Sequence, residues 1–421
     1  MKVLMFGWEY PPFISGGLGS ACHGITLGLS QHGFEIVFVV PRMKGTMEYG
    51  HVRMIDGSTV RLSARDSRKI RKSLCIKPVD AFLVPYMNEE SYREALKKSV
   101  AVRNKGEVKN DAWSHYGPDL YDEVFRYGKI ARRIAKQESF DIIHVHDWMT
   151  MPAGIEAKAE TGKSLVVHIH ALESDRSSGR INERIYGIER EGMVNADRII
   201  AVSHYTKRKI VDQYGIQHSK ISVVHNAVTH TESRQRYAVV KDPDVPCVLF
   251  LGRMTSQKGP DYFLDAARKV LKKNDTVKFI MAGSGDMLDG LKEKTIQMGI
   301  QNNVCFTGFL RGADVEKAYA MSDLYVMPSV SEPFGISALE AIMYDVPVIL
   351  SRRSGVCEII SNCPKVDFWN TDELAEKIIS ILADNDLRNE IVKMCKDELK
   401  DINWKIAGEK IMHVYGELMM I

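Results

Sequence analysis

The chain has 421 residues, of which 45% are apolar and 26% are charged. This composition is typical of a globular protein with enough apolar residues for two or three cores, and it argues against disorder and fibrous repeats. The 57 Lys and Arg residues nearly balance the 54 Asp and Glu residues, which leaves a formal net charge of +3. Nucleic acid is therefore not expected as the main partner.

Cysteine usage and hydropathy bear on the cellular compartment. The seven cysteines are scattered and form no CxxC pair, so neither a disulfide framework nor a zinc ribbon is expected. The N-terminus lacks the apolar segment of a signal peptide, and no apolar stretch is long enough to span a bilayer. We expect a cytoplasmic protein without a transmembrane segment, for which peripheral membrane contact remains an alternative.

Short β-branched and aromatic runs alternate with helix-length segments in the first half of the chain, which is typical of a parallel sheet with helical crossovers. The segment Thr229–Pro246 is polar, contains two prolines and interrupts this alternation. We interpret it as the link between two domains. The predicted strands before it are Lys2–Phe6, Glu35–Val40, Phe140–Val145, Ser164–Ile169, Arg198–Val202 and Ile221–Val224.

A second alternating series follows the link, so the chain is predicted to be α/β, with two Rossmann-like doubly wound domains that face a central cleft. The first domain is predicted over residues 1–230 and the second over residues 231–402. Residues 403–421 are helical in period and are a candidate to pack back on the first domain. The strands predicted in the second series are Pro246–Leu251, Val277–Ala282, Val304–Thr307, Asp323–Met327 and Pro347–Leu350.

The alternation is weak between Lys44 and Gly117, where Arg61–Lys72 holds six basic residues in twelve positions. A charge run of this kind is most often a solvated face. Contact with a polyanionic or membrane surface and an acceptor-binding insertion are the two functional alternatives, and the sequence does not choose among the three.

A glycine-rich turn, Ser15-Gly16-Gly17-Leu18-Gly19, lies between the first predicted strand and the predicted helix Ser20–Gln31. Such a turn brings backbone N–H groups and the positive end of the helix dipole close to an anion, so a phosphate is the expected ligand. The turn matches neither Gly-x-Gly-x-x-Gly nor the Walker loop, which disfavours a dehydrogenase or a nucleotidase.

Two cations and two carboxylates follow strands of the second domain. Arg253 and Lys258 come directly after the strand Pro246–Leu251, and such a pair can neutralise a departing diphosphate. Glu332 and Glu340 follow the strand Asp323–Met327, the first in a loop and the second within the next predicted helix. Carboxylates accept hydrogen bonds from sugar hydroxyls, so these two glutamates can bind different parts of one ligand.

These motifs, in this order and over nearly the whole chain, resemble the retaining GT-B glycosyltransferases of glycosyltransferase family four, which include the bacterial glycogen and starch synthases. The resemblance implies that Arg253 and Lys258 hold the diphosphate of a nucleotide sugar and that Glu340 binds the ribose hydroxyls. It implies that the donor sugar is bound by Glu332 and by the backbone amides of Phe334, Gly335 and Ile336. Gly16 and Gly17 would close onto the phosphates from the other lobe, and the loop near Leu310 would meet the nucleobase.

Two histidine pairs, His144 with His146 and His168 with His170, each place both imidazoles on one face of a strand, a spacing that a zinc site can use. The resemblance implies a different use, in which His170 lies near the transferred sugar and Asp147 lines the acceptor side. The family generally works without a metal, so neither a metal nor another cofactor is expected besides the nucleotide-sugar co-substrate.

The segment from His170 to Gly179 departs from the glycogen synthase pattern, which weakens any assignment of the acceptor. Glu173 and Asp175 within it are further candidates to bind acceptor hydroxyls, although solvation would explain both equally well. The resemblance implies a retaining, metal-independent hexosyltransferase that moves glucose from ADP-glucose or UDP-glucose to the non-reducing end of an α-glucan. The alternatives are transfer to a lipid-linked or cell-envelope saccharide and a sugar-nucleotide-binding protein without turnover.

Overall fold

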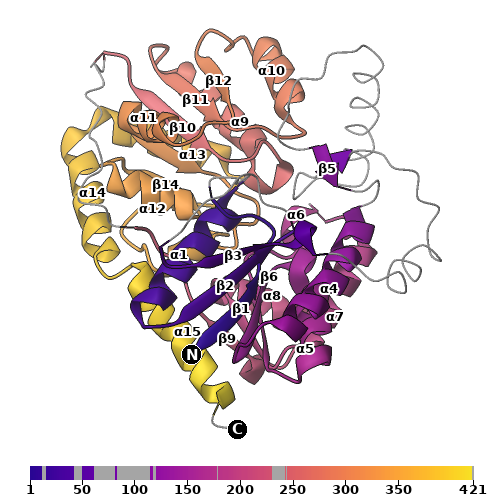
Figure 1. Ribbon diagram of the computed structural model, residues 1–421. Helices are drawn as coiled ribbons and strands as arrows, with labels where there is room; N and C mark the ends of the chain where they lie inside the picture. Colours follow the sequence, from indigo (N-terminus) through magenta and orange to yellow (C-terminus); the bar gives the residue numbers. More distant parts are fainter. Residues whose placement is uncertain are drawn as a thin grey trace.

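The computed structural model describes residues 1–11, 16–41, 50–60, 81–82, 114–116, 120–177, 179–229, 242 and 244–419. The basic segment Arg61–Lys72, Ser15 and most of the predicted link Thr229–Pro246 lie outside these described residues. The predicted α/β class with two Rossmann-like domains is confirmed, because the described strands include two parallel sheets of seven and six strands (Figure 1).

The first sheet has the strand order β3-β2-β1-β6-β7-β8-β9, and every described pairing within it is parallel. Its central strands are nearly continuous apolar runs, as expected when helices cover both faces of a parallel sheet. The strands are β1 (Lys2–Phe6), β2 (Glu35–Val40), β3 (Arg53–Asp56), β6 (Ile142–His146), β7 (Leu165–Ile169), β8 (Arg198–Ala201) and β9 (Ile221–Val223).

The two faces of the first sheet are covered by different helices. Residues of α1 (Gly17–Gln31) and α15 (Trp404–Met419) form one apolar core with one face. The other face packs against α4 (Leu120–Gln137), α5 (Met151–Thr161), α7 (Glu183–Asn195) and α8 (His204–Tyr214). The weakly patterned region contributes β3 and a short antiparallel pair, β4 (Ala81–Phe82) with β5 (Ser114–Tyr116), which the sequence pattern did not predict.

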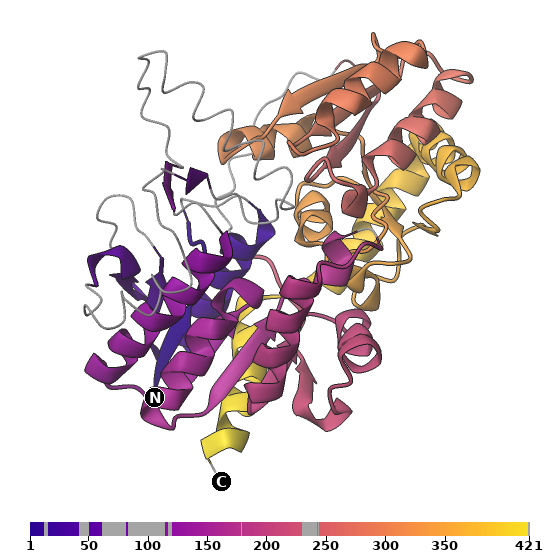
Figure 2. The ribbon, with the colours of Figure 1, turned by 90° about the vertical axis from the view of Figure 1, so that its right-hand side faces the viewer.

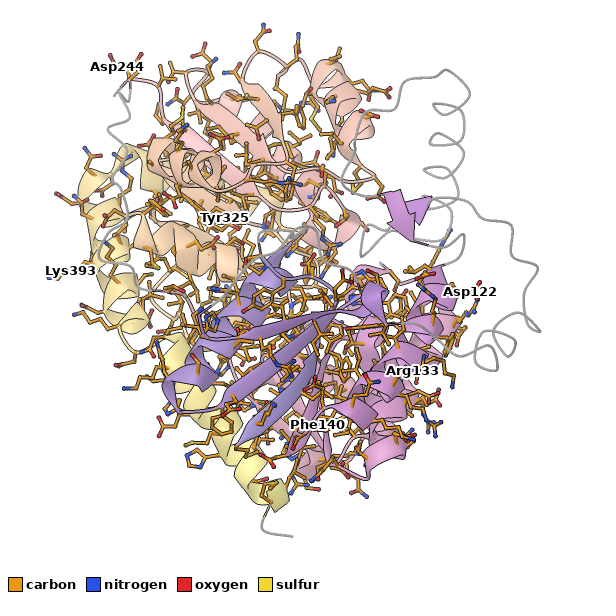
Figure 3. The ribbon with its side chains drawn as sticks, in the orientation of Figure 1. Asp122, Arg133, Phe140, Asp244, Tyr325 and Lys393 are labelled. Atoms are coloured by element: carbon orange, nitrogen blue, oxygen red, sulfur yellow. The ribbon has the colours of Figure 1, made fainter. Side chains whose placement is uncertain are left out.

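The second sheet has the order β12-β11-β10-β13-β14-β15, again with parallel pairing. Figure 3 shows Tyr325 of β13 inside this domain, whereas Asp244 and Lys393 project from its periphery. The strands are β10 (Cys247–Leu251), β11 (Lys278–Ala282), β12 (Val304–Gly308), β13 (Leu324–Met327), β14 (Val348–Ser351) and β15 (Lys365–Val366). Its helices are α9 (Pro260–Leu271), α10 (Leu288–Gln297), α11 (Ala313–Met321), α12 (Ile336–Met343), α13 (Thr371–Ala383) and α14 (Asn385–Leu399).

The strand order reverses at β1 in the first sheet and at β10 in the second. The strands that follow are added first on one side (β2 and β3; β11 and β12) and then on the other (β6 onward; β13 onward). In open α/β sheets, ligands bind outside the carboxyl ends of the strands at such switch points. The glycine-rich turn follows β1, and Arg253 follows β10, so the fold brings both predicted motifs to these positions.

The last described helix, α15, returns from the second domain and lies along the first domain beside α1 (Figures 1 and 2). Glycines allow the two helices to approach at backbone distance. A Cβ atom added at Gly28 would lie 2.0 Å from the carbonyl oxygen of Trp404, and one added at Gly408 would lie 2.5 Å from the carbonyl carbon of Gly28. The C-terminal helix therefore fixes the position of α1, whose N-terminus carries the glycine-rich turn.

Within the described ranges, no helix combines the length and the apolar composition that crossing a bilayer requires.

Gly28→Ala should destabilise the protein, because the new methyl group would force α15 away from α1. Overpacking of this kind costs about 1–3 kcal/mol of unfolding free energy, which urea unfolding and the melting temperature would report. Gly416→Ala on α15 is the matched control, since a Cβ atom there meets nothing within 4 Å and alanine favours the helix by roughly 0.5–1 kcal/mol. Equal stability of the two variants would show that the close helix contact does not constrain the fold.

Candidate functional site

A cavity of about 310 Å³ lies between the carboxyl edges of the two sheets. The residues predicted to bind the nucleotide sugar line it, whereas the acceptor candidates Asp147, Glu173 and Asp175 do not. The first domain contributes Gly16, Gly17 and His170, and the second contributes Arg253, Lys258, Leu310, Glu332, Phe334, Gly335, Ile336 and Glu340. Residues more than 300 positions apart in the chain thus form one enclosure, which is the arrangement predicted for the cleft.

Lys258 and Glu332 form an ion pair in the wall of the cavity. The Lys258 Nζ atom lies 2.5 Å from Glu332 Oε2, and Ser329 Oγ donates to the same carboxylate oxygen over 3.1 Å. Glu332 is only 5% exposed, and a buried carboxylate without such partners would be strongly unfavourable. Lys258, in the loop after β10, therefore neutralises the carboxylate of Glu332, in the loop after β13, and both side chains line the cavity.

Helix α12 begins at the cavity wall with Gly335 as its N-cap. The φ angle of Gly335 is 107°, a conformation that favours glycine, and an added Cβ atom would lie 2.9 Å from Met327 Cε. The first N–H groups of a helix have no partner inside the helix, so they and the helix dipole favour an anion at this end. Glu340 lies one turn further along α12 and accepts a hydrogen bond of 3.0 Å from Tyr319 Oη.

The four predicted histidines form one stack on the face of the sheet that α1 and α15 cover, in which His144, His146 and His168 are buried and His170 is partly exposed. His146 Nδ1 lies 3.0 Å from His170 Nε2, and His144 Nε2 lies 3.3 Å from His168 Nδ1. Burial lowers the pKa of His170 to about 3, so its imidazole is neutral at physiological pH. Among the four, only His170 reaches the cavity wall.

His144, His146 and His168 have ring nitrogens within 4.8 Å of one another, which is the one grouping among the described residues with a spacing that a metal ion requires. A metal held by these three would have to compete with the bond between His144 and His168 and with the contact of His144 Nδ1 to Tyr415. Three imidazoles are a ligand set that zinc can use, but both ring nitrogens of His144 are already engaged in these contacts. In this structure the group is therefore arranged as a hydrogen-bonded stack.

Asp147 lies behind the cavity wall, with 1% of its surface exposed, and is not among the residues that line the cavity. Its Oδ1 atom accepts hydrogen bonds from the backbone N–H groups of His170, at 2.7 Å, and Ala171, at 3.3 Å. Burial raises the pKa of its carboxyl to about 6, against the lowering effect of Arg176 and of these hydrogen bonds. In this structure Asp147 holds the backbone of His170, and its place on the acceptor side stays a prediction.

Glu173 and Asp175 are also buried, at 5% and 2% exposure, and neither lines the cavity. Glu173 pairs with Arg176 over 3.5 Å, and Asp175 binds Lys209 and Ser331. These contacts engage both carboxylates inside the protein, whereas the sequence had made them candidates for acceptor hydroxyls.

The loop Gly283-Ser284 after β11 also lines the cavity and was missed in the sequence. A Cβ atom at Gly283 would lie 1.8 Å from the carbonyl oxygen of Gly252. The loop can therefore lie this close to the end of β10 only because position 283 is glycine. The Gly-Ser-Gly run directly after a predicted strand is the signal that would have found it. Asn226 and Gln257 line the cavity as well, and no sequence pattern pointed to them.

Two family descriptions match consecutive parts of the chain. "Glycosyltransferase Family 4" matches residues 96–232, and "Glycosyl transferases group 1" matches residues 231–397. An uncharacterized glycosyltransferase of Methanocaldococcus jannaschii is 29% identical, over 99% of this chain and 98% of that protein. A glycogen synthase of Mycobacterium tuberculosis is 23% identical, over 99% of this chain and 94% of that protein.

Solved structures share the fold over the whole chain. A sucrose-phosphate synthase from Thermosynechococcus elongatus superposes with a TM-score of 0.75 at 16% identity, over 100% of this chain and 99% of that one. The Anabaena protein HepE in complex with UDP and glucose superposes with a TM-score of 0.65 at 16% identity, over 99% of both chains.

The titration of Asp147 should appear in the pH dependence of stability. Its carboxyl has a higher pKa in the folded protein, about 6, than its ordinary value of 3.8, so the folded state binds this proton more tightly. The contribution of the protonated Asp147 carboxyl to the unfolding free energy is therefore fully present below pH 3.8 and is lost as the pH rises through about 6. Asp147→Asn removes it.

Urea unfolding of both proteins between about pH 4.5 and pH 8 would test this linkage. The unfolding free energy of the wild type minus that of Asp147→Asn should fall up to about pH 6 and then stay level. A difference that does not change with pH would contradict the raised pKa.

Proposed function

Because the chain belongs to the GT-B glycosyltransferases of group 1 and family 4, we propose that it transfers glucose from a nucleotide sugar to a saccharide, with retention of configuration. The observation that carries the proposal is the cavity in which the cations Arg253 and Lys258 and the carboxylates Glu332 and Glu340 face Gly16, Gly17 and His170 of the other lobe. ADP-glucose and UDP-glucose are the proposed donors. The proposed acceptor is the non-reducing end of an α-glucan, which the likeness to a glycogen synthase over nearly the whole chain supports.

Charge complementarity supports a diphosphate in this cavity. Arg253 offers a planar fork of donors and Lys258 a compact positive charge, while the N-terminus of α12 adds backbone N–H groups. A diphosphate that binds Lys258 competes with Glu332 for the ammonium group, since the two side chains are paired at 2.5 Å. Donor binding would thus release Glu332 from Lys258 and leave its carboxylate to accept hydrogen bonds from the hydroxyls of the donor sugar.

The proposed reaction is a front-face substitution at the anomeric carbon. The bond from that carbon to the diphosphate oxygen breaks, and its electron pair stays with the diphosphate. The acceptor oxygen bonds to the same face of the carbon, and its proton passes to the departing phosphate oxygen. Arg253, Lys258 and the start of α12 stabilise the leaving charge, which is the main catalytic contribution in this proposal.

In this proposal His170 lies beside the anomeric carbon as a neutral imidazole, and two contacts support it at the cavity wall. Asp147 binds its backbone N–H, and His146 binds its Nε2 atom. A neutral ring can polarise and orient the donor sugar without adding a charge that would compete with the departing diphosphate. Closure of both lobes around the cavity would limit hydrolysis of the donor by water.

Release of nucleoside diphosphate from ADP-glucose, UDP-glucose, UDP-galactose and GDP-mannose tests the function, with and without glycogen or maltooligosaccharides. We expect glucan-dependent release from a glucose donor, at the same rate in EDTA as with added Mg²⁺ or Mn²⁺, because the cations of the site replace a metal. Release that glucan does not stimulate would favour a lipid-linked or cell-envelope acceptor. An absence of release from every donor would contradict the proposed transferase activity and favour a binding protein.

Lys258→Ala should lower turnover by about two to three orders of magnitude, because it removes a charge that stabilises the departing diphosphate. Lys272→Ala is the matched control, since Lys272 is an exposed lysine of the same domain. Steady-state rates would be measured for both variants, along with melting temperatures to show that each is folded. Wild-type turnover in a folded Lys258→Ala variant would refute the diphosphate assignment.

A further inference from the structure

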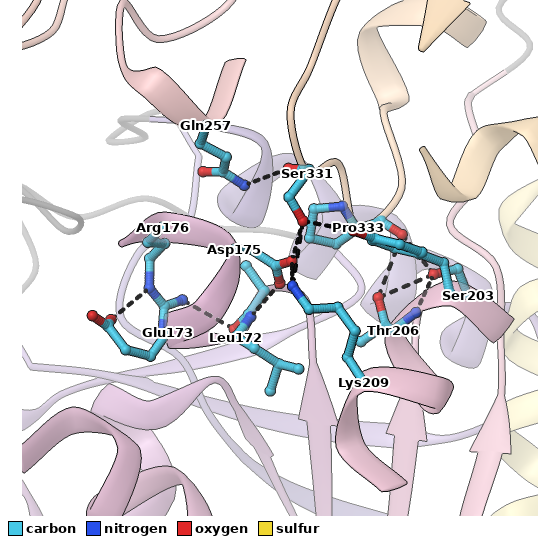
Figure 4. A network of polar contacts seen from close by, with 12 residues as sticks. Leu172, Glu173, Asp175, Arg176, Ser203, Thr206, Lys209, Gln257, Ser331 and Pro333 are labelled. Carbon is cyan, nitrogen blue, oxygen red and sulfur yellow. Dashed lines mark hydrogen bonds and ion pairs between the residues drawn. The ribbon is translucent and has the colours of Figure 1, made fainter. Parts of the chain in front are cut away.

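The loop that carries Glu332 is bound on both sides by residues of the opposite domain. Ser331 Oγ donates a hydrogen bond of 2.6 Å to Asp175 Oδ1, and Ser203 Oγ donates one of 2.6 Å to the carbonyl oxygen of Pro333 (Figure 4). The side chains that make these bonds are at most 8% exposed. The two residues that flank Glu332 in the chain are thus held by the first domain.

The hydrogen bond between Ser331 and Asp175 has a defined direction. The Asp175 carboxylate is paired with Lys209 and also accepts the backbone N–H of Leu172 over 2.8 Å, so it acts here as an acceptor. The single hydroxyl proton of Ser331 therefore points to Asp175, and Tyr205 Oη donates to Ser331 Oγ over 2.8 Å. A buried hydrogen bond to a carboxylate in such a network is stronger than a neutral one and fixes the serine rotamer.

Within the second domain, Ser331 is tied to the residues that bind the ligand. Gln257 Nε2 donates to the carbonyl oxygen of Ser331 over 3.1 Å, and the backbone N–H of Ser331 donates to the carbonyl oxygen of Gln257 over 3.4 Å. The next residues along these two loops, Lys258 and Glu332, form the ion pair of the cavity. Because Glu332 is the next residue in the chain, a displacement of Ser331 would move the backbone that carries the Glu332 carboxylate.

Within the first domain, Asp175 belongs to the short helix α6 (Glu173–Arg176), five residues after His170. Its bond to the backbone of Leu172 fixes the turn between them. One compact segment therefore carries the imidazole that lines the cavity and the carboxylate that holds the Glu332 loop.

We propose that Asp175, supported by Lys209, is a positioning residue that sets Glu332 relative to His170 across the interdomain cavity through its bond to Ser331. The inference rests on the proposed function, in which Glu332 binds the donor sugar. Asp175 touches neither the cavity nor a reacting atom and acts only through Ser331. Loss of the contact between Asp175 and Ser331 should disturb the alignment of the donor sugar rather than the binding of the diphosphate. The groups proposed to hold the diphosphate, Arg253, Lys258 and the N-terminus of α12, do not bond to Asp175.

The test compares the wild type with Ser331→Ala, Asp175→Asn and the double variant, with Asp212→Asn as the matched control. Asp212 is an exposed carboxylate of α8, so its variant makes the same chemical change away from the interface. Glu358 binds the backbone N–H groups of His204 and Tyr205 over 2.8 and 2.7 Å, a contact between the domains that Ser331→Ala leaves in place. The measurements are kcat, the donor KM, the affinity for the nucleoside diphosphate alone and the melting temperature.

We expect each single variant to lower kcat roughly tenfold or more, the size of the loss of one charge-assisted hydrogen bond. The affinity for the nucleoside diphosphate should stay within about twofold, and the double variant should be no slower than the slower single variant, because the two residues act as one contact. The control should match the wild type.

Wild-type kcat in both single variants, or losses that add up in the double variant, would overturn the inference while leaving the transferase proposal intact. A parallel loss of nucleoside diphosphate affinity and melting temperature would also overturn it, because that pattern indicates a purely structural role. A wild-type protein that turns over no donor would refute both proposals. This outcome is distinguishable from the others, because the wild type is assayed before the variants.

Discussion

The carboxyl edges of two parallel sheets meet across one cavity, and the arrangement of the site depends on this constraint. In a parallel sheet every strand runs in the same direction, so the loop after each strand emerges at the same edge. The turn after β1, the loop after β10 and the loop after β13 are distant in the chain but adjacent in space for this reason. Helix α15 reinforces the arrangement, because it crosses from the second domain and packs at backbone distance against α1.

Buried carboxylates organise the segment that follows β7. Asp147 binds the backbone of His170, Glu189 binds that of Glu173, and Asp175 binds that of Leu172. The cations inside this group are Arg176 and Lys209. Burial raises the pKa of Asp147 to about 6 and that of Glu189 to about 7, against the lowering effect of Arg176 on both carboxyl groups. The segment that presents His170 is thus held by buried carboxyl groups. Ionisation of Asp147 and Glu189 lowers the stability of the folded protein, because burial disfavours their charged forms.

In the proposed function, the ion pair between Lys258 and Glu332 prepares the cavity for a charged ligand. A buried carboxylate would be expensive alone, and the ammonium group offsets that cost in the structure as it stands. A diphosphate carries enough negative charge to take over Lys258, and sugar hydroxyls can then take the place of the ammonium group at Glu332. In the proposed function the same two side chains would pair with each other before the donor binds and contact the donor afterwards. The loop that carries Glu332 is bound to the opposite domain through Ser331 and Pro333.

The sequence by itself determined the parallel strands, the division into two sheets and the motif residues that line the cavity, but not Asn226, Gln257 or the Gly283-Ser284 loop. Strands such as Lys2–Phe6 and Glu35–Val40 could be predicted to the residue, because burial on both faces makes them continuous apolar runs bounded by polar turns. The motif residues were identified because each follows such a strand. Strand β3 and the β4–β5 pair could not be predicted, since their region lacks a clear apolar pattern.

Only the tertiary structure decided what the buried acids do. Asp147, Glu173 and Asp175 look like exposed ligand-binding carboxylates in the sequence, because the chain pattern does not show which side of a loop faces a cavity. Their partners, among them Lys209 and Ser331, lie 34 and 156 residues from Asp175. Contacts of that separation are fixed by how the two sheets and their helices pack, and local sequence carries no record of that packing.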